Sequence, residues 1–169
     1  MTEKQPPIFR NIDEAEYRDL VSGRCVRQAE YKKGSVLFHT GDRTREFGIL
    51  LDGEIHIENM DVWGTRLILH SIGVGQSFAE TYAFCNEPLM VDVTAARDSR
   101  VLFVDLGVLQ TPANYGKYWY TKLLQNLLVL STQKNLAWST RMVCITSKSI
   151  RTRVMTYLSS EAVRRGSME

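Results

Sequence analysis

The stretch GQSFAETYAFCNEPLMVDVTA, residues 75–95, decides the fold. It predicts a glycine turn, a short helix that opens at Phe-Ala-Glu, a break at Pro88, and then an alternating strand. The first amides of a helix have no intrahelical partner and favour an anion. The strand, however, begins with Leu89 and Met90, and neither side chain can pair with an anion. The stretch therefore predicts a small cradle with an apolar floor.

Around this stretch, from Cys25 to about Asp105, short apolar runs alternate with glycine-containing turns. The segment EFGILLDGEIHIENMD, residues 46–61, predicts a hairpin around Asp52-Gly53, a strong turn signal. Strands that recur every 8 to 12 residues favour an antiparallel sandwich or barrel. The prediction is a mainly β fold with helices: an antiparallel β-roll of the jelly-roll, cupin-like kind. The other strand-like runs are CVRQAEY (25–31), SVLFHT (35–40), TRLILHSI (65–72) and SRVLFVD (99–105).

Helices are expected on both sides of the β region. Asp13 predicts an N-cap for a short helix that ends near Val21. Residues 117–148 contain neither glycine nor proline and predict one long helix with two apolar seams, too many for one small barrel to cover. We expect that helix to form a homodimer, from about Tyr118 to Ile145. The expected dimer residues are Leu123, Leu124, Leu127, Leu130, Trp138 and Ile145.

The bulk composition is that of a soluble globular protein. The chain has 169 residues, 44% of them hydrophobic and 24% charged, and a net charge of +2. It has no membrane-length apolar run and no signal peptide, so we expect no membrane association. Three widely spaced cysteines indicate a reduced, cytoplasmic chain. Residues 141–169 carry six basic and two acidic residues, a basic segment that a solvated helix face also explains.

The order of these elements resembles the N-terminal sensor of the Crp/Fnr family of bacterial transcription regulators. Three stretches carry the resemblance: YKKGSVLFHTGD (31–42), GILLDGEIHI (48–57) and the cassette at 75–95. It covers the chain from about Ile12 to Leu158. It implies a β-roll sensor domain over residues 1–110, a dimerisation helix over 111–147 and a short hinge helix over 148–169. It also implies a small-molecule effector.

In this family the cassette reads Phe-Gly-Glu, followed on the next strand by an Arg that pairs with the cyclic phosphate, while the Glu meets the ribose. Here Phe78 and Glu80 match, Ala79 replaces the glycine, and Leu89 stands where the Arg belongs. Without that pair, about 1.5–3 kcal/mol is forfeited, so cyclic AMP is not the expected effector. A neutral, aromatic or small organic molecule suits the site better; alternatively, Glu80 only caps the helix. The resemblance places the effector against Phe78, Ala79, Glu80, Thr81, Leu89, Met90, Lys134 and Asn135.

Other chemistries find less support. His39, His56 and His70 match no metal-ligand pattern, so no metal site is expected. The N-terminal cysteine cluster of the family's iron–sulfur branch is missing, and nothing marks a haem ligand. A thiol sensor at Cys25, Cys85 or Cys144 remains an alternative. No nucleophile–base pair or carboxylate couple indicates catalysis, so we do not expect an enzyme.

The family's members continue beyond the hinge helix into a winged helix-turn-helix that reads DNA. This sequence stops at Glu169, before such a domain. We expect a fragment of a longer regulator, whose DNA contact, and contact with RNA polymerase, depend on the full-length protein. The alternative is a stand-alone cyclic-nucleotide-binding-like signalling module with no DNA role. The coding frame beyond Glu169 distinguishes the two.

Overall fold

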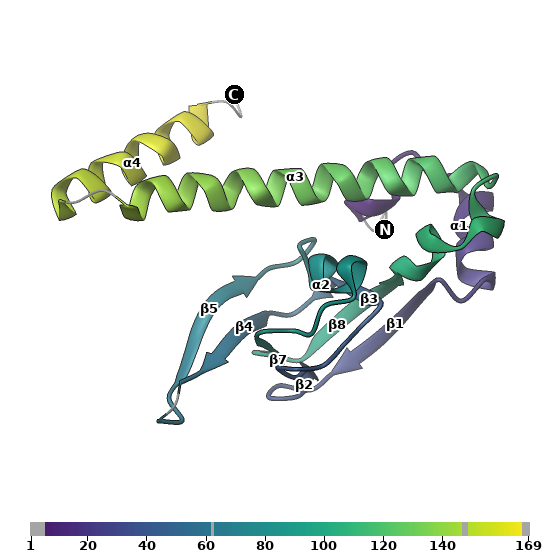
Figure 1. The fold of residues 1–169 in the computed structure, drawn as a ribbon, viewed down its shortest axis with the longest axis horizontal. Coiled ribbons are helices and arrows are strands. Elements are labelled where there is room, and N and C mark those ends of the chain that lie inside the picture. The colour runs from purple at the N-terminus through teal and green to yellow at the C-terminus, as the bar shows by residue number, and fades with distance from the viewer. Residues whose placement is uncertain (1–5, 62, 147–148, 167–169) are drawn as a thin grey trace. The chain divides into compact units, whose positions relative to one another are not determined.

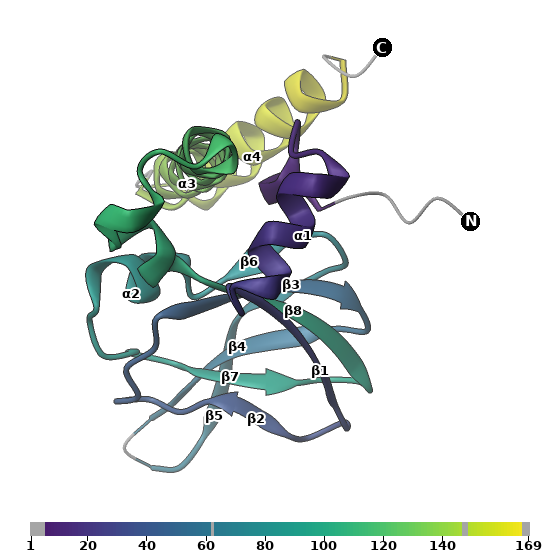
Figure 2. The same cartoon turned by 90° about the vertical axis from the view of Figure 1, so that its right-hand side faces the viewer.

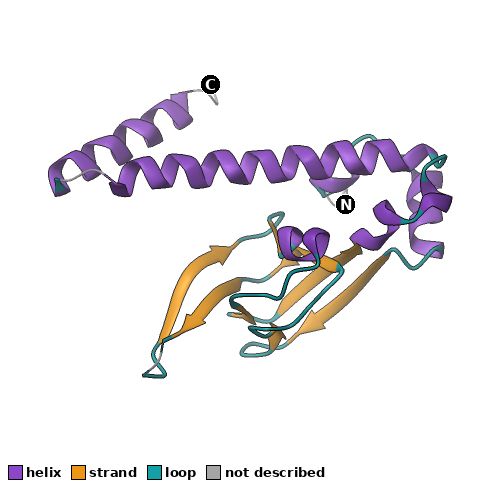
Figure 3. Ribbon diagram, in the orientation of Figure 1, coloured by secondary structure: helices purple, strands orange, loops and turns teal. Residues whose placement is uncertain are grey.

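The computed structural model describes residues 6–61, 63–146 and 149–166. The chain divides into two compact units, residues 1–127 and 128–169, which are described separately. The described residues form eight strands and, after the last of them, a long helix; the ribbon is drawn in Figures 1 and 3. The strands are β1 Val26–Tyr31, β2 Val36–Phe38, β3 Glu46–Asp52, β4 Ile55–Met60, β5 Arg66–Ile72, β6 Ser77–Phe78, β7 Asp92–Ala95 and β8 Ser99–Asp105. The helices are η1 Pro7–Phe9, α1 Glu14–Ser22, α2 Glu80–Cys85, η2 Leu106–Gln110, η3 Pro112–Asn114, α3 Tyr118–Thr146 and α4 Ile150–Gly166.

The strands form two four-stranded antiparallel sheets that face each other (Figure 2). Their strand orders are β1-β8-β3-β6 and β2-β7-β4-β5. Apolar side chains from both sheets, which alternate with outward-facing residues, fill the space between them. The predicted antiparallel β-roll with a long C-terminal helix is thereby confirmed. The core of the roll contains Leu50, Ile55, Ile72, Phe78, Leu89, Val93, Val101 and Phe103.

The turn at Asp52-Gly53 forms where it was predicted, but the hairpin does not. Gly53 has a φ of 93°, in the left-handed region that a tight turn requires. The two strands that it joins belong to different sheets: β3 pairs with β8 and β6, whereas β4 pairs with β5 and β7. The prediction of a paired hairpin is wrong. The turn is a corner that carries the chain from one sheet to the other.

The short N-terminal helix begins as its sequence indicates. The Asp13 carboxylate accepts a hydrogen bond from the Glu16 amide, and the Glu16 carboxylate accepts one from the Asp13 amide, each at 2.9 Å. This reciprocal pair is a capping box, which satisfies two amides that a helix start leaves unpaired. The predicted Asp cap is confirmed.

The start of α3 is held against the N-terminal helices within the first unit. Trp119 is 3% exposed, and its Nε1 donates to Asp19 Oδ2 over 2.7 Å, while Lys117 Nζ lies 2.9 Å from the same oxygen. Asn126 Nδ2 donates to the carbonyl oxygens of Ile8 and Arg10, both at 2.8 Å. The first ten residues of the long helix are therefore part of the fold of the first unit.

This junction predicts a dependence of stability on pH. The hydrogen bond from Trp119, followed by the contact with Lys117, holds the pKa of Asp19 below its usual value. A carboxyl with a lowered folded-state pKa stabilises the fold above its ordinary pKa, and that contribution disappears as the pH falls through the folded-state value. We expect Asp19→Asn to lower the free energy of unfolding by about 1 kcal/mol at neutral pH, because the pair is partly exposed and screened.

The measurement is urea unfolding, followed by circular dichroism, at several pH values. Wild type and Asp19→Asn should differ at neutral pH, and the difference should shrink as the pH falls through the lowered pKa of Asp19. Glu14→Gln is the matched control, since its ion pair with Arg18 lies at the surface and should contribute little. An undiminished difference between wild type and Asp19→Asn at low pH would contradict the assignment.

The second unit consists of the C-terminal part of α3 followed by α4, with a reversal of chain direction between them (Figure 1). Cys144 is 7% exposed, whereas most large apolar side chains of this unit are open to solvent. None of the described helices is long and apolar enough to cross a membrane. The exposed apolar residues of the unit are Leu128, Val129, Leu136, Trp138, Met142, Val143, Ile145, Ile150, Val154, Met155, Tyr157 and Leu158.

Candidate functional site

The first part of the cassette spans the junction of β6 and α2. The close approach of the Gly48 backbone fixes the position of Phe78. β6 pairs with β3, which places Phe78 opposite Gly48. A Cβ on residue 48 would overlap the Phe78 ring, so only glycine leaves room for it. The ring then packs edge-on against Phe38 and Phe103, with both centroid distances at 6.4 Å. Phe78 is 2% exposed and anchors the cassette in the core.

Ala79 occupies a backbone conformation that suits glycine. It is the N-cap of α2 with φ 67° and ψ 5°, in the left-handed region, and its side chain makes no capping hydrogen bond. A non-glycine residue pays about 1–2 kcal/mol for this conformation. Ala79, which stands where the cassette pattern has glycine, therefore has a backbone conformation typical of glycine.

We expect Ala79→Gly to raise the free energy of unfolding by about 1 kcal/mol, because it removes the left-handed strain. Ala83→Gly, in the same helix, should lower that free energy by about the same amount, because a helix interior favours alanine. Ala83 is buried and makes an ordinary helical hydrogen bond to the Ala79 carbonyl. Chemical denaturation of both variants provides the measurement. If both variants changed the free energy of unfolding in the same direction, the left-handed conformation of Ala79 would carry no energetic cost.

Glu80 is the first residue of α2 and is turned into the protein. It is 5% exposed, and its Oε1 accepts a hydrogen bond from the Ser77 hydroxyl at 3.1 Å. Ser77 was not among the predicted site residues, although Ser-Phe-Ala-Glu has the spacing of a serine followed by an acid three residues later. The buried carboxylate is thus held in place by a neighbour on β6, whichever ligand the site takes.

Leu89 forms part of the apolar core and is not on an open floor. It is 2% exposed and belongs to the cluster that includes Leu50, Phe78 and Val93. Its backbone is fixed to the loop after β2, since its amide donates to the Asp42 carbonyl at 2.8 Å and its carbonyl accepts from Gly41 at 2.7 Å. Met90, by contrast, is 74% exposed. The two residues therefore have opposite environments.

The predicted site residues divide into three groups. Phe78 and Leu89 belong to one buried cluster, against which Ala79 packs, and Glu80 is buried with a hydrogen bond from Ser77, while Thr81 and Met90 face solvent. Lys134 and Asn135 belong to α3 in the second unit, so their part in the site remains a prediction. Asn135 Oδ1 accepts a hydrogen bond from Ser139 Oγ one turn along the same helix, at 3.3 Å.

The histidines and cysteines are placed as follows. The His56 ring lies between two carboxylates of its own sheet, 3.5 Å from Glu54 and 3.6 Å from Glu58. Among the described residues, no three His, Cys, Asp or Glu side chains gather as a metal site would require. Cys85 is exposed; Cys25 is buried, and burial raises the pKa of its thiol.

The first unit is similar to a known family of domains. Residues 28–111 match the family model of the cyclic nucleotide-binding domain. The matched domain runs from β1 through the cassette to the end of η2. No relative among the curated proteins matches the chain.

Solved structures share the fold at low sequence identity. The N-terminal domain of a transcriptional regulator from Streptomyces coelicolor A3(2) is 22% identical with a TM-score of 0.61, over 81% of this chain and 95% of that one. A cyclic nucleotide-binding domain from Methylobacillus flagellatus KT is 16% identical with a TM-score of 0.67, over 85% and 83%. The Thermus thermophilus catabolite activator protein is 16% identical with a TM-score of 0.63, over 83% and 63%.

Proposed function

We propose that this chain is the effector-sensing and dimerisation part of a Crp/Fnr-type bacterial transcription regulator, and that its effector is a neutral, aromatic or small organic molecule, not cyclic AMP. The match to a cyclic nucleotide-binding domain and the likeness to the N-terminal domain of a transcriptional regulator support the class. Effector binding would bias two arrangements of paired α3 helices and so place DNA-binding domains in the full-length protein. No part of this function requires catalysis.

The observation that carries the proposal is the burial of Leu89. At the position where the family's Arg pairs with a cyclic phosphate, this chain has an apolar side chain that is 2% exposed and packed in the core. A phosphate brought to that position would lose its hydration and gain no cation there. Glu80, which accepts a hydrogen bond from Ser77, is the acidic residue of the cassette that a hydroxyl or amino group of a different ligand would meet.

Titration calorimetry with cyclic AMP and cyclic GMP tests the choice of effector. We expect binding no tighter than roughly 0.1 mM, which corresponds to about −5.5 kcal/mol. Micromolar binding of either nucleotide by the unmodified chain would refute the argument from Leu89. Lys134 would then be the first candidate for the cation, and Lys134→Gln would test it.

The burial pattern of α3 supports a dimer surface in the second half of the helix. Leu123 and Leu127 are 0% and 6% exposed within a single chain, so both are already buried by their own unit. Leu124, Trp138 and Ile145 are 39%, 51% and 59% exposed and remain available to a second copy. A charge at position 127 would disturb the fold whether or not the chain dimerises, so the test belongs further along the helix.

Sedimentation at micromolar concentration provides that test. Ile145→Glu should shift the wild-type dimer toward monomer, because it places two charges in the expected seam. Leu136→Glu is the control: Leu136 is 69% exposed and lies on the opposite side of the helix, since nine residues turn an α-helix by about 900°. A monomeric wild type, or equal effects of the two variants, would contradict the proposed interface.

A further inference from the structure

The first unit contains a pocket at the C-terminal end of α2, apart from the buried cassette residues Phe78, Glu80 and Leu89. Its volume is about 370 Å³, toward the small end of the range for ligand pockets. It is open to solvent, and three segments line it: the loop before β3, the C-terminal end of α2 with its cap, and η2 with the residue that follows. The lining residues are Arg45, Ala83, Asn86, Gly107, Gln110 and Thr111.

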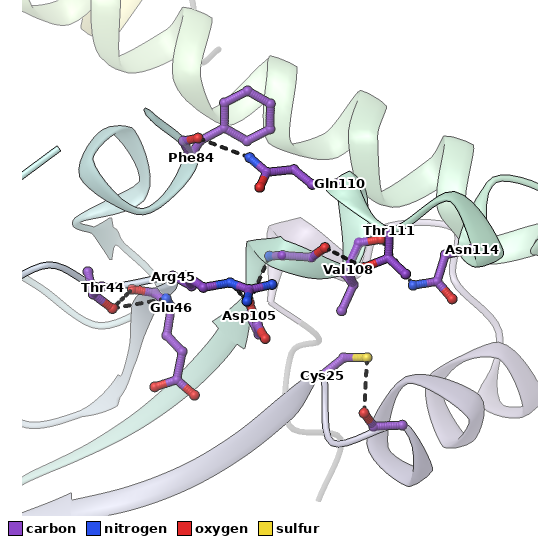
Figure 4. A network of polar contacts seen from close by, with 12 residues as sticks. Cys25, Thr44, Arg45, Glu46, Phe84, Asp105, Val108, Gln110, Thr111 and Asn114 are labelled. Carbon is purple, nitrogen blue, oxygen red and sulfur yellow. Dashed lines mark hydrogen bonds and ion pairs between the residues drawn. The ribbon is translucent and has the colours of Figure 1, made fainter. Parts of the chain in front are cut away.

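Arg45 is the charged residue of this lining. Its guanidinium occupies space that is free only because Gly107 has no side chain. Its guanidinium lies directly against Gly107, where any Cβ would overlap it. Its Nε lies 3.8 Å from Asp105 Oδ1, too far for a hydrogen bond, and that oxygen already accepts the Gly107 amide at 2.7 Å (Figure 4). Asp105 therefore orients the guanidinium without saturating its five N–H donors.

The remaining walls are fixed by hydrogen bonds to the backbone. Gln110 Nε2 donates to the Phe84 carbonyl at 3.2 Å, which ties η2 to α2 (Figure 4). The Thr111 hydroxyl donates to the Gly107 carbonyl at 2.9 Å. On the far side, the Asn86 carbonyl accepts a hydrogen bond from Arg43. The cavity is thus formed in advance of any ligand, which lowers the cost of binding.

We propose that this cavity binds a small carboxylate that carries a neighbouring hydroxyl or amide. The planar guanidinium fork matches a carboxylate in two-point geometry. The side-chain amides and the hydroxyl of the lining suit a second polar group of the ligand. A singly charged carboxylate is favoured over a phosphate dianion, because the Asp105 carboxylate beside Arg45 repels a second negative charge. This site is independent of the ligand at the cassette.

The test is an amide-proton NMR titration of the full chain with lactate, and separately with inorganic phosphate. Lactate should produce saturable shifts at the amides of Gly107, Gln110 and Thr111, with millimolar affinity, and phosphate should bind more weakly. Arg45→Gln should abolish the shifts. Arg18→Gln is the matched control: it removes the same charge from an exposed side chain on α1 and should leave the titration unchanged.

A second variant separates the position of the guanidinium from its charge. Gly107→Ala keeps Arg45 but displaces its guanidinium, and the far end of an exposed side chain can move without disrupting the fold. We expect an unchanged melting temperature and at least a fivefold loss of lactate affinity. The proposal is overturned if wild type shows no saturable shift, if Arg45→Gln still binds lactate, or if phosphate binds more tightly than lactate.

Discussion

Leu123→Ala is expected to lower the free energy of unfolding of the first unit by about 2–5 kcal/mol. Leu123 is 0% exposed and lies in the first turns of α3, between Trp119, which is tied to Asp19, and Asn126, which is tied to the η1 segment. Removal of a buried leucine side chain forfeits its transfer free energy and leaves a cavity that neighbours fill only in part. For a chain with ordinary stability, this is a large share of the total.

Leu128→Ala provides the control for this result. Leu128 is 63% exposed on the same helix, five positions further on, so its truncation should change the free energy by no more than about 0.5 kcal/mol. Urea unfolding, followed by circular dichroism, would compare the free energies of unfolding of the two variants. If both cost less than 1 kcal/mol, the start of α3 is not packed in the first unit, and Leu123 returns to the list of residues available to a dimer.

The sequence was sufficient to predict the elements whose cause is local. The capping box at Asp13 depends on residues three apart, and β8 extends over the seven residues of the predicted run SRVLFVD. The turn at Gly53 formed because glycine tolerates a positive φ. Which strands pair across that turn depends on contacts between residues far apart in the chain, and for this reason the predicted hairpin was wrong.

The apolar periodicity of α3 was likewise sufficient for only part of the prediction. A seam with 4-3 spacing indicates that one face of a helix is buried, but it does not identify the partner. The structure assigns Leu123 and Leu127 to the chain's own first unit and leaves Trp138 and Ile145 exposed. The cavity beside Arg45 could not be predicted at all, because it depends on the meeting of Arg45 and Gly107, which no motif connects.

The cassette motif singled out Phe78, Glu80 and Leu89, and all three are buried in the roll. The motif did not predict how deeply the Leu89 side chain is buried in the core. An apolar residue at a ligand position can form the open wall of a pocket or fill the core, and sequence alone does not distinguish the two. The packing of Leu89 with Leu50 and Val93 indicates the second.

Leu89→Arg is therefore expected to destabilise the first unit by about 3–5 kcal/mol, because it places an unpaired charge in an apolar core. Two controls isolate the cause. Met90→Arg adds the same charge to the adjacent residue, which is 74% exposed, and should change stability by about 0.5 kcal/mol or less. Leu89→Met conserves volume and polarity and should cost less than about 1.5 kcal/mol. Leu89→Arg as stable as Met90→Arg would show that the side chain at position 89 reaches solvent.

The same variant tests whether the cassette keeps its family geometry. In Leu89→Arg with Met90→Ser, a cyclic phosphate would supply the partner that the buried guanidinium lacks, so cyclic AMP should recover about 1.5–3 kcal/mol of the loss. The measurement is the melting temperature with and without cyclic AMP, for the double variant and for wild type. A shift in the double variant alone would mean that Ala79, with its left-handed backbone, and Glu80 still form the family's cradle around a core-filling leucine. No shift in either protein would mean that the cradle has been rebuilt for another ligand or has closed, because an arginine and a phosphate brought together in the family's geometry would pair.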